Sequence, residues 1–563
     1  MFTSLASFNA FAQSDLAQQR QIYNQAQKLL QQGKVSEYQS LRPRISNYPL
    51  TPYLDYNVFK SSLRSKTPAQ VEAFSKQYKD FPFSESVRAN YLDELAKAGS
   101  WQRYLQYQTT EPNSEKYKCQ YYYAKYMTGQ RGAAYKGAES LWLSGRSISS
   151  ACDPLFSRWE ASGQRTDDLV LERMKLAFGA RNSSLVTYLS KEFKTANYKS
   201  LGSAAEALYK NPTSVVNFSK RRPITQDSQD FAVLGHKLLS RKNTQQAVSV
   251  LEQVAANQKL SKTQKQEMAD EAASWLTNTE STYLAQWRDK ALSTSSNLER
   301  LERRARLAIQ NGNMKGLEGW IARMPKEGQD DLRWQYWQAR VEMAKGDKSK
   351  AEKRLKAMLG ERNFYSAAAA VALNQPIEID SVTVKDNPDL IRNNQAALTR
   401  IKEMKALNKR GSARNEWLYL IHNASLEQKE QLALYAQKHH WYNDSVVATI
   451  EGDMWDHLSL RFPIAYQATY QRYARKHNVS PITLMALSRQ ESAFNEVIRS
   501  PVGARGLMQI MPATASHTAR KFGISYSGVN QLVQPEKNIE IGSQYFASLM
   551  DDYNNNRIFS LAG

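Results

Sequence analysis

Cysteine is almost absent from this sequence of 563 residues, which contains only Cys119 and Cys152. Two cysteines are too few for the paired cysteine motifs of the usual zinc sites, so the sequence excludes that class of metalloprotein. The two residues either form one disulfide in an oxidising compartment, which would contribute about 3–4 kcal/mol, or remain two free buried thiols. Their spacing leaves both alternatives open.

Long apolar runs are missing as well. No stretch reaches the ~18 uninterrupted apolar residues of a transmembrane helix, so we expect no membrane span. A hydrophobic content of 41% and a mean hydropathy of −0.63 are typical of a soluble globular chain. Residues 1–13 lack a basic start but end in the A-x-A pattern of Ala10 to Ala12, which we interpret as a signal remnant or an alternative start. An ordinary chain terminus is the alternative.

Cofactor and nucleic-acid motifs are also lacking. There is no phosphate-binding glycine loop, and His439, His440 and His457 lack the spacing of a known metal site, so we expect no cofactor and no metal. The net charge of +22 would suit a nucleic-acid partner. However, the basic residues are scattered among acidic ones, for example from Arg300 to Arg306, and no recognisable nucleic-acid motif is present. We therefore expect no nucleic-acid partner.

Helical patterns fill the sequence from about residue 15 to residue 360, with little alternation of β-branched residues. The segments ending at Gly312 and Gly346 align with each other at an offset of 34 residues, which is a helix-hairpin period. Gly99 and Gly132, 33 residues apart, suggest the same repeat. The sequence therefore predicts an all-α superhelix over residues 14–373.

A break in the helical pattern runs from Asn374 to Pro388 and marks the clearest linker. After it, the residues up to 450 contain further helices, including Gln395 to Leu407 and Leu426 to His439. We assign 374–450 to a helical linker domain and 451–563 to a C-terminal module.

The C-terminal module contains the candidate acid. Ser480 and Pro481 are typical of a helix start, and Leu484, Leu487 and Glu491 follow at helical spacing, so we expect the carboxylate to share the face that seeks the core. Burial in apolar surroundings disfavours an ionised carboxyl and suits an acid that must hold its proton near neutrality. A half-covered surface glutamate is the alternative.

A glycine-rich loop follows this helix, and with it comes a resemblance. The pattern is Glu491-Ser492-x-Phe494-Asn495, then Ser500-Pro501-x-Gly503-Ala504-x-Gly506-Leu507-Met508-Gln509-Ile510-Met511-Pro512. From about residue 461 onward it resembles the catalytic module of the soluble lytic murein transglycosylases. The stretch from Trp441 to Pro463 is similar to the large, ring-shaped periplasmic member of that family, so the resemblance extends more weakly over most of the chain.

The resemblance implies a helical superhelix or ring that carries a lysozyme-like domain. It also implies a periplasmic protein, which favours a disulfide between Cys119 and Cys152. The implied substrate is the glycan strand of peptidoglycan, whose carboxylates suit a basic protein. We expect a monomer without cofactor, with cell-wall synthesis or turnover proteins as further partners.

The implied reaction cleaves the β-1,4 bond between N-acetylmuramic acid and N-acetylglucosamine. Ordinary glycosidases use two carboxylates, about 5 Å apart or more, but this motif supplies only Glu491. We expect Glu491 to protonate the glycosidic oxygen and then to activate the C6 hydroxyl, which attacks C1. The family pattern further implies substrate contacts at Ser500, Gln509 and Met511. Glu540 and Tyr545, on a later helix that resembles the family's scaffold helix behind the site, are weaker candidates.

The sequence ends at Gly563, before the A-Y-N-A-G block of the family, whose tyrosine helps to position the catalytic glutamate. We therefore expect reduced activity at best from the chain as given. Two alternatives to a transglycosylase follow: a hydrolytic muramidase on the same fold, or a non-catalytic ring that binds peptidoglycan or proteins.

Overall fold

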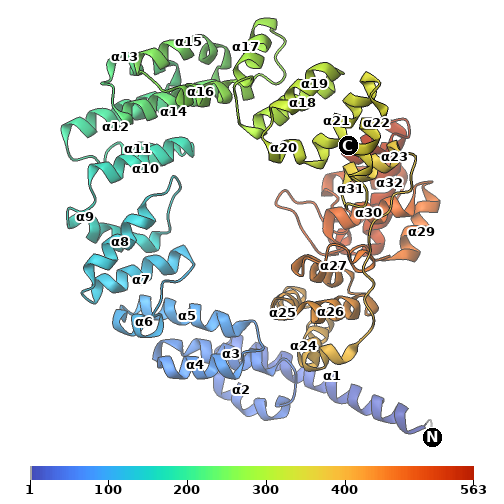
Figure 1. The fold of residues 1–563 in the computed structure, drawn as a ribbon. Coiled ribbons are helices and arrows are strands. Elements are labelled where there is room, and N and C mark those ends of the chain that lie inside the picture. The colour runs from blue at the N-terminus through green and yellow to red at the C-terminus, as the bar shows by residue number, and fades with distance from the viewer. Residues whose placement is uncertain (1–2) are drawn as a thin grey trace. The chain divides into compact units, whose positions relative to one another are not determined.

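The computed structural model describes residues 3–563, with side chains from residue 16 onward, and consists of helices that are mostly joined by short turns (Figure 1). Within that range there are no named strands, only two isolated bridges that pair Arg499 with Arg505 and Arg505 with Ile510. The predicted all-α class is confirmed. The signal remnant predicted for residues 1–13 lies outside the residues whose side chains are described.

Two compact units make up the chain. The first combines Met1–Tyr91 with Asp380–Gly563, and the second is Leu92–Ile379. The predicted domain boundaries near residues 374 and 451 are not the boundaries of these units, and they remain predictions. None of the helices in the described range is long and apolar enough to cross a membrane.

The second unit is a succession of short helices. α5 (Phe83–Lys97) leads into it, and the others are α6 (Trp101–Tyr107), α7 (Glu115–Met127), α8 (Arg131–Trp142), α9 (Asp153–Ala161), α10 (Asp167–Gly179), α11 (Ser183–Leu189), α12 (Ala196–Lys210), α13 (Val215–Arg221), α14 (Gln226–Lys242), α15 (Thr244–Asn257), α16 (Lys262–Ser274), α17 (Thr282–Leu292), α18 (Leu298–Gln310), α19 (Met314–Arg323), α20 (Lys326–Asp330), α21 (Leu332–Lys345), α22 (Lys348–Lys356) and α23 (Phe364–Ala372).

Helix hairpins recur in this unit as the repeat predicts. Gly312 separates α18 from α19 and Gly346 separates α21 from α22, and both glycines have the positive φ that lets a chain leave a helix at little cost. The alignment of Gly99 with Gly132 is wrong, because Gly132 lies inside α8 and Gly129, with φ of 90°, forms the turn before it. Gly129 and Gly132 are only three residues apart, so the sequence alone could not show which of the two forms the turn.

Cys119 of α7 and Cys152 of the 3-10 helix η3 (Ser150–Cys152) form the disulfide, and both side chains are fully buried. We expect Cys119→Ser combined with Cys152→Ser to lower the free energy of unfolding of this unit by about 3–4 kcal/mol, because the open loop of the unfolded chain regains its entropy. Thermal unfolding of the oxidised protein and the double variant measures this difference. Equal midpoints would contradict the expectation.

His236 of α14 is completely buried in the second unit, and its Nε2 lies 2.8 Å from the carbonyl oxygen of Ala247. Burial lowers its pKa to about 4. In the unfolded chain His236 has an ordinary histidine pKa near 6.5. Between pH 6.5 and pH 4 the unfolded chain therefore binds a proton at this histidine that the folded protein does not bind. Stability is therefore fully present above pH 6.5 and decreases by about 3 kcal/mol as the pH falls to 4.

Urea unfolding between pH 7 and pH 4 tests this expectation. His236→Gln can still donate to Ala247 but does not titrate, so its loss of stability on acidification should be smaller than that of the wild type. An identical pH dependence of the two proteins would show that His236 does not contribute.

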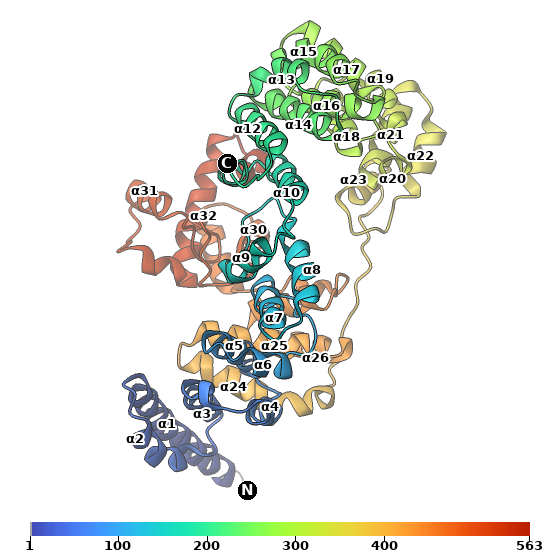
Figure 2. The same ribbon diagram turned by 90° about the vertical axis from the view of Figure 1, so that its left-hand side faces the viewer.

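The first unit combines both ends of the chain. Its N-terminal helices are α1 (Thr3–Gln31), α2 (Val35–Leu41), α3 (Thr51–Ser61) and α4 (Pro68–Gln77), and its C-terminal helices are α24 (Gln395–Ala406), α25 (Arg410–His422), α26 (Leu426–Lys438), α27 (Tyr442–Glu451), α28 (Leu458–Arg461), α29 (Gln467–Lys476), α30 (Pro481–Ser492), α31 (Pro512–Phe522), α32 (Pro535–Asp552) and α33 (Arg557–Ala562). Figure 2 shows the non-helical stretch between α23 and α24, where the sequence predicts the linker.

One hydrophobic core joins the two ends of the chain within this unit. Tyr48, in the turn before α3, and Leu54 of α3 pack in the same buried cluster as Ile401 and Trp417. Arg20 of α1 donates two hydrogen bonds to the buried carboxylate of Glu403 on α24, at 2.7 and 2.8 Å. The N-terminal helices therefore stabilise the segment that the sequence assigns to the linker domain.

A second core in the same unit supports the C-terminal module. α27 joins the two cores, because Val447 packs into the first and Val446 into the second. The second core contains Tyr470 of α29, Leu484 of α30 and Ile539 of α32. This packing fixes α30, which carries Glu491, against the linker helices.

Candidate active site

α30 begins where the sequence predicts. The side chain of Ser480 caps the helix by accepting a hydrogen bond from the backbone N–H of Thr483 at 3.3 Å, and Pro481 occupies the first turn. The helix ends at Ser492, one residue after Glu491. Glu491 therefore lies in the last turn, directly before the loop.

Glu491 itself is exposed, so the prediction that it shares the buried face is wrong. The buried stripe is formed by Leu484, Ser488 and Ser492. Tyr470 donates a hydrogen bond of 2.6 Å to the Oγ of Ser488, and Ser492 donates to the carbonyl oxygen of Ser488 at 2.9 Å. Because these serines form hydrogen bonds in the core, they lie on the buried face of the helix and Glu491 lies on the exposed face. A prediction based on the spacing of apolar residues does not detect this orientation.

The turn after Glu491 is strained and held from outside the module. Ala493 and Phe494 have φ of 48° and 62°, a region that residues other than glycine rarely adopt. The Phe494 ring is buried in the second core. Asn443 of α27 donates a hydrogen bond of 3.0 Å to the carbonyl oxygen of Ala493. A linker helix thus fixes the turn that follows the candidate acid.

Two other glutamates of the C-terminal module, Glu496 and Glu540, have side-chain partners. Glu496 accepts hydrogen bonds from Arg410 at 2.5 Å and Tyr466 at 2.6 Å. Burial and the charge of Glu496 raise the pKa of Tyr466, which keeps that phenol protonated as the donor. Glu540 pairs with Lys537 at 2.5 Å. In contrast, no side-chain hydrogen bond or ion pair is recorded for Glu491 in the described part of the chain, so its carboxyl group is available to a ligand.

The loop from Ala493 to Met511 carries the other candidate residues. Its backbone is braced by reciprocal hydrogen bonds of 3.1 Å between Arg505 and Ile510. Ser500 accepts a hydrogen bond from the N–H of Ala504 at 3.0 Å, so its own hydroxyl hydrogen can be donated elsewhere. Gln509 has φ of 46° and donates its amide to the carbonyl of Gly506 at 2.9 Å, which leaves its amide oxygen as an acceptor. Met511 is 39% exposed.

A buried amide on α32 holds this loop. Asn538 is fully buried and accepts a hydrogen bond from the N–H of Met508 at 2.9 Å. It donates to the carbonyl oxygens of Arg505 at 3.0 Å and Leu532 at 2.8 Å. Gly506, with φ of 75°, allows this approach, because a Cβ there would lie 2.0 Å from the carbonyl oxygen of Leu532. The loop and α32 are therefore one packed unit.

The weaker sequence candidates lie on α32. Glu540 is bound by Lys537, with Lys476 at 3.9 Å, and its ion pairs within the described residues do not include a contact with Glu491. Tyr545 is partly buried on the same helix and likewise makes no recorded bond to Glu491. Ser500, Gln509 and Met511 all lie in the loop after α30, and Glu540 and Tyr545 lie in α32, which is packed beside that loop.

Three residues that position the site have no role in the sequence analysis: Asn443, Arg410 and Tyr466. Each forms a hydrogen bond to the turn after α30 from 30 or more residues away in the sequence. A polar residue on a helix carries no signal of such a contact. The similarity of the segment that includes Asn443 to the family was the only pointer available.

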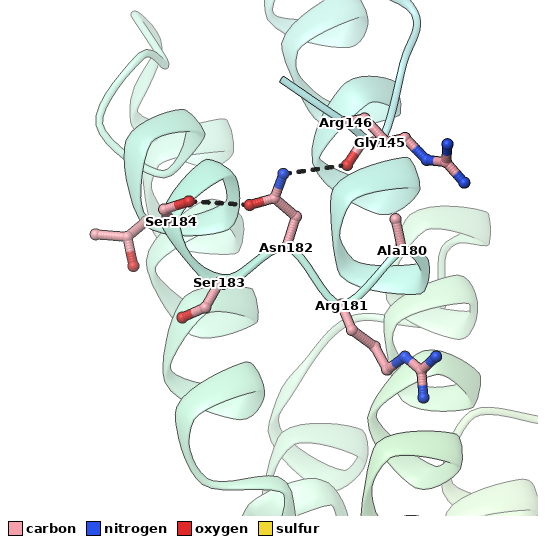
Figure 3. A pocket seen from close by; sticks show the side chains of 8 residues that line it. Gly145, Arg146, Ala180, Arg181, Asn182, Ser183 and Ser184 are labelled. Carbon is pink, nitrogen blue, oxygen red and sulfur yellow. Dashed lines mark hydrogen bonds between the residues drawn. The ribbon is translucent and has the colours of Figure 1, made fainter. Parts of the chain in front are cut away.

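A shallow depression in the second unit is lined by Arg146, Arg181, Asn182, Ser183, Ser184 and Thr187, and none of these side chains carries a carboxyl group that could act as the acid. Figure 3 shows that the Asn182 amide is used within the fold, donating to the carbonyl of Gly145 at 3.4 Å and accepting from Ser184 at 3.0 Å. Across the described residues, no group of three or more His, Cys, Asp or Glu side chains could hold a metal ion.

Family models match two parts of the chain. Residues 468–563 match the transglycosylase SLT domain, and residues 392–458 match the soluble lytic murein transglycosylase L domain. The first match contains α30 and the loop after it, and the second contains most of the linker helices.

Relatives match the chain over almost its entire length. It is 36% identical to the soluble lytic murein transglycosylase of Salmonella typhimurium over 99% of this chain and 87% of that protein. The crystal structure of the 70-kDa soluble lytic transglycosylase from Escherichia coli matches 97% of this chain and 88% of that one, with a TM-score of 0.88 and 35% identity. An inactive Glu-to-Gln mutant of the transglycosylase Slt from Pseudomonas aeruginosa matches with a TM-score of 0.84 and 30% identity, over 96% of this chain and 88% of that one.

Proposed function

This chain belongs to the soluble lytic murein transglycosylase family, and on that basis we propose that it cleaves the bond between N-acetylmuramic acid and N-acetylglucosamine and leaves 1,6-anhydromuramyl ends. One observation supports a mechanism with a single acid. Glu491 has a free carboxyl group, whereas Glu496 and Glu540 are tied to cations. Hydrolysis with two carboxylates needs a second free acid across the bond, and neither of these two is free to serve as one.

In the proposed reaction Glu491 first acts as the acid. It transfers its proton to the glycosidic oxygen as the bond to C1 of the muramic acid breaks, and the sugar's own N-acetyl carbonyl stabilises the cationic centre. The resulting carboxylate then removes the proton from the C6 hydroxyl, whose oxygen forms the new bond to C1. The proton returns to Glu491, and no water is consumed.

The loop after α30 supplies the proposed sugar contacts. Ser500 can donate its hydroxyl hydrogen to the N-acetyl carbonyl, because the bond from the N–H of Ala504 uses a lone pair of its oxygen and leaves that hydrogen free. Gln509 would accept from a sugar hydroxyl through its amide oxygen, and the exposed Met511 would cover an apolar sugar face. Glu540 and Tyr545 would act indirectly, by packing α32 behind this loop.

Product analysis tests the proposed function. Purified peptidoglycan is incubated with the protein, and the released fragments are treated with borohydride, which reduces free reducing ends but leaves anhydro ends unchanged. Fragments that resist reduction support the transglycosylase. Fragments that are all reduced would identify a hydrolytic muramidase, and binding without release would identify a non-catalytic peptidoglycan-binding protein.

The hydrogen bond from Asn443 to the turn leads to a further expectation. Asn443→Ala removes the donor to Ala493 and lets the strained turn relax, so we expect kcat to fall about tenfold while KM changes less than twofold. Arg414→Ala is the matched control, because it removes the 3.3 Å hydrogen bond to the other end of the same amide and leaves the bond from Asn443 to Ala493 in place. Kinetics on soluble glycan fragments separate the two variants. A rise in KM with unchanged kcat would show that Asn443 does not position the acid.

We also propose that the protein acts in the periplasm. The disulfide between Cys119 and Cys152 fits an oxidising compartment, which is where peptidoglycan is accessible. The exposed positive charge would attract the carboxylates of that polymer. We expect a monomer, with cell-wall synthesis or turnover proteins as additional partners.

A further inference from the structure

The first unit contains a cavity that is separate from the Glu491 site. It has a volume of about 600 Å³ and lies between the N-terminal residues 46–52 and 80–81 and the linker residues 393–400 and 416–423. All of these residues belong to the same unit, and none belongs to the C-terminal module. Its volume is within the range of small-ligand sites.

The floor of this cavity is a closed polar network. Arg400 and Glu416 are both buried and form an ion pair at 2.8 Å. Arg400 also donates to the carbonyl oxygen of Asp80 at 2.7 Å and lies over the Phe81 ring at 3.9 Å, and Tyr53 donates to Glu416. Because both charges are used within the floor, the floor is rigid but offers no free charge to a ligand.

The rim differs from the floor because its side-chain amides have hydrogen-bonding groups without a partner in the fold. Asn47 and Asn393 make no recorded side-chain hydrogen bond among the described residues, and both are exposed. Asn423 uses only its NH₂ group, toward the carbonyl of Tyr419 at 2.9 Å. The Oδ1 of Asn394 is buried without any partner. These amides contrast with Asn182 in the other unit, whose side chain is used within the fold (Figure 3).

The chemistry of the ligand follows from these groups. Free amides pair with hydroxyl and acetamido groups as both donors and acceptors, and the rings of Phe81 and Tyr419 offer apolar walls. The exposed Asp80 at the rim disfavours an anion, and the paired Arg400 cannot attract one. An uncharged, acetamido-bearing sugar therefore fits this cavity better than a carboxylated stem peptide.

We propose that this cavity is a second glycan-binding site that holds a short N-acetylglucosamine-containing stretch of the strand. The identity of the sugar rests on the proposed function, but the binding itself does not. Such a site would keep a long strand attached between cleavages, because a second contact on the same polymer raises its local concentration. We expect it to matter for the polymer and not for short fragments.

Calorimetric titration with N-acetylchitotetraose tests this proposal, using the full chain with Glu491→Gln so that nothing is cleaved. Adding Asn47→Ala and Asn393→Ala should weaken binding at this site at least tenfold, whereas Asn182→Ala, in the depression of Figure 3, should not change it. Hydrogen exchange locates the bound sugar, with protection expected in residues 46–52 and 393–423. Equal affinity with and without the two substitutions would overturn the proposal.

Two further measurements distinguish a second glycan-binding site from a peptide-binding site and from the proposed catalytic function. On an otherwise unchanged chain, Asn47→Ala with Asn393→Ala should slow the release of fragments from whole peptidoglycan but not from short soluble glycans. Binding of a stem-type peptide that the same substitutions abolish, with chitotetraose unaffected, would assign the cavity to peptides and contradict us. A protein that forms no anhydro ends but still binds chitotetraose here would refute the proposed function and leave this inference intact.

Discussion

Glu491→Gln should reduce the release of anhydromuramyl fragments at least about 1,000-fold relative to the unchanged chain. An amide of the same shape cannot donate a proton to the glycosidic oxygen or remove one from the C6 hydroxyl. Glu496 and Glu540 cannot take over, because Glu496 is bound by Arg410 and Tyr466 and Glu540 by Lys537. Mass spectrometry of the released fragments measures the loss.

Stability and binding distinguish this effect from misfolding. Glu491 is exposed and makes no recorded side-chain contact in the described chain, so its substitution should change the free energy of unfolding by less than about 0.5 kcal/mol. Glu451→Gln, at another exposed glutamate of the same unit, serves as the matched control and should retain full activity. Retention of more than a tenth of the activity by Glu491→Gln would remove Glu491 from the mechanism.

Asn538→Leu should destabilise the loop between α30 and α31 by about 3 kcal/mol or more. The substitution leaves the N–H of Met508 and the carbonyl of Leu532 buried without partners, each at a cost of about 1–3 kcal/mol. The carbonyl of Arg505 keeps its bond from Ile510. Because Ser500 and Gln509 belong to this loop, we expect the activity to decrease as the loop becomes less ordered.

Hydrogen exchange of the amides from Arg505 to Ile510 reports this local stability directly. Ser543→Ala is the matched control on the same helix, because Ser543 is fully buried but bonds only to the carbonyl of Glu540 within α32. We expect it to cost less than about 1 kcal/mol. Similar exchange in the two variants would show that Asn538 does not hold the loop.

Features set by local sequence were predictable. Ser480 and Pro481 start α30 because a capping oxygen and a fixed φ act within one turn, and Gly312 and Gly346 end helices because only glycine adopts their φ without strain. The break between α23 and α24 follows from the prolines and polar residues there. Each of these signals acts over a few residues and needs no knowledge of the packing.

Features set by packing were not predictable. The buried hydrogen bond between Tyr470 and Ser488 rotates α30, and no apolar pattern reveals that a serine will be the residue that faces the core. The core shared by α1, α3, α24 and α25 brings together residues almost 400 positions apart, such as Arg20 and Glu403. The contact of Asn443 with Ala493 likewise depends on how α27 docks against the C-terminal module.

The most direct test of the mechanism is the cleavage reaction in water enriched in heavy oxygen, with the products weighed by mass spectrometry. If Glu491 directs the C6 hydroxyl to C1, the new ends are anhydromuramyl groups, lighter than reducing ends by one water and free of the heavy isotope. Reducing ends that carry heavy oxygen would show that water attacks C1, and would contradict a reaction driven by one carboxyl group without water.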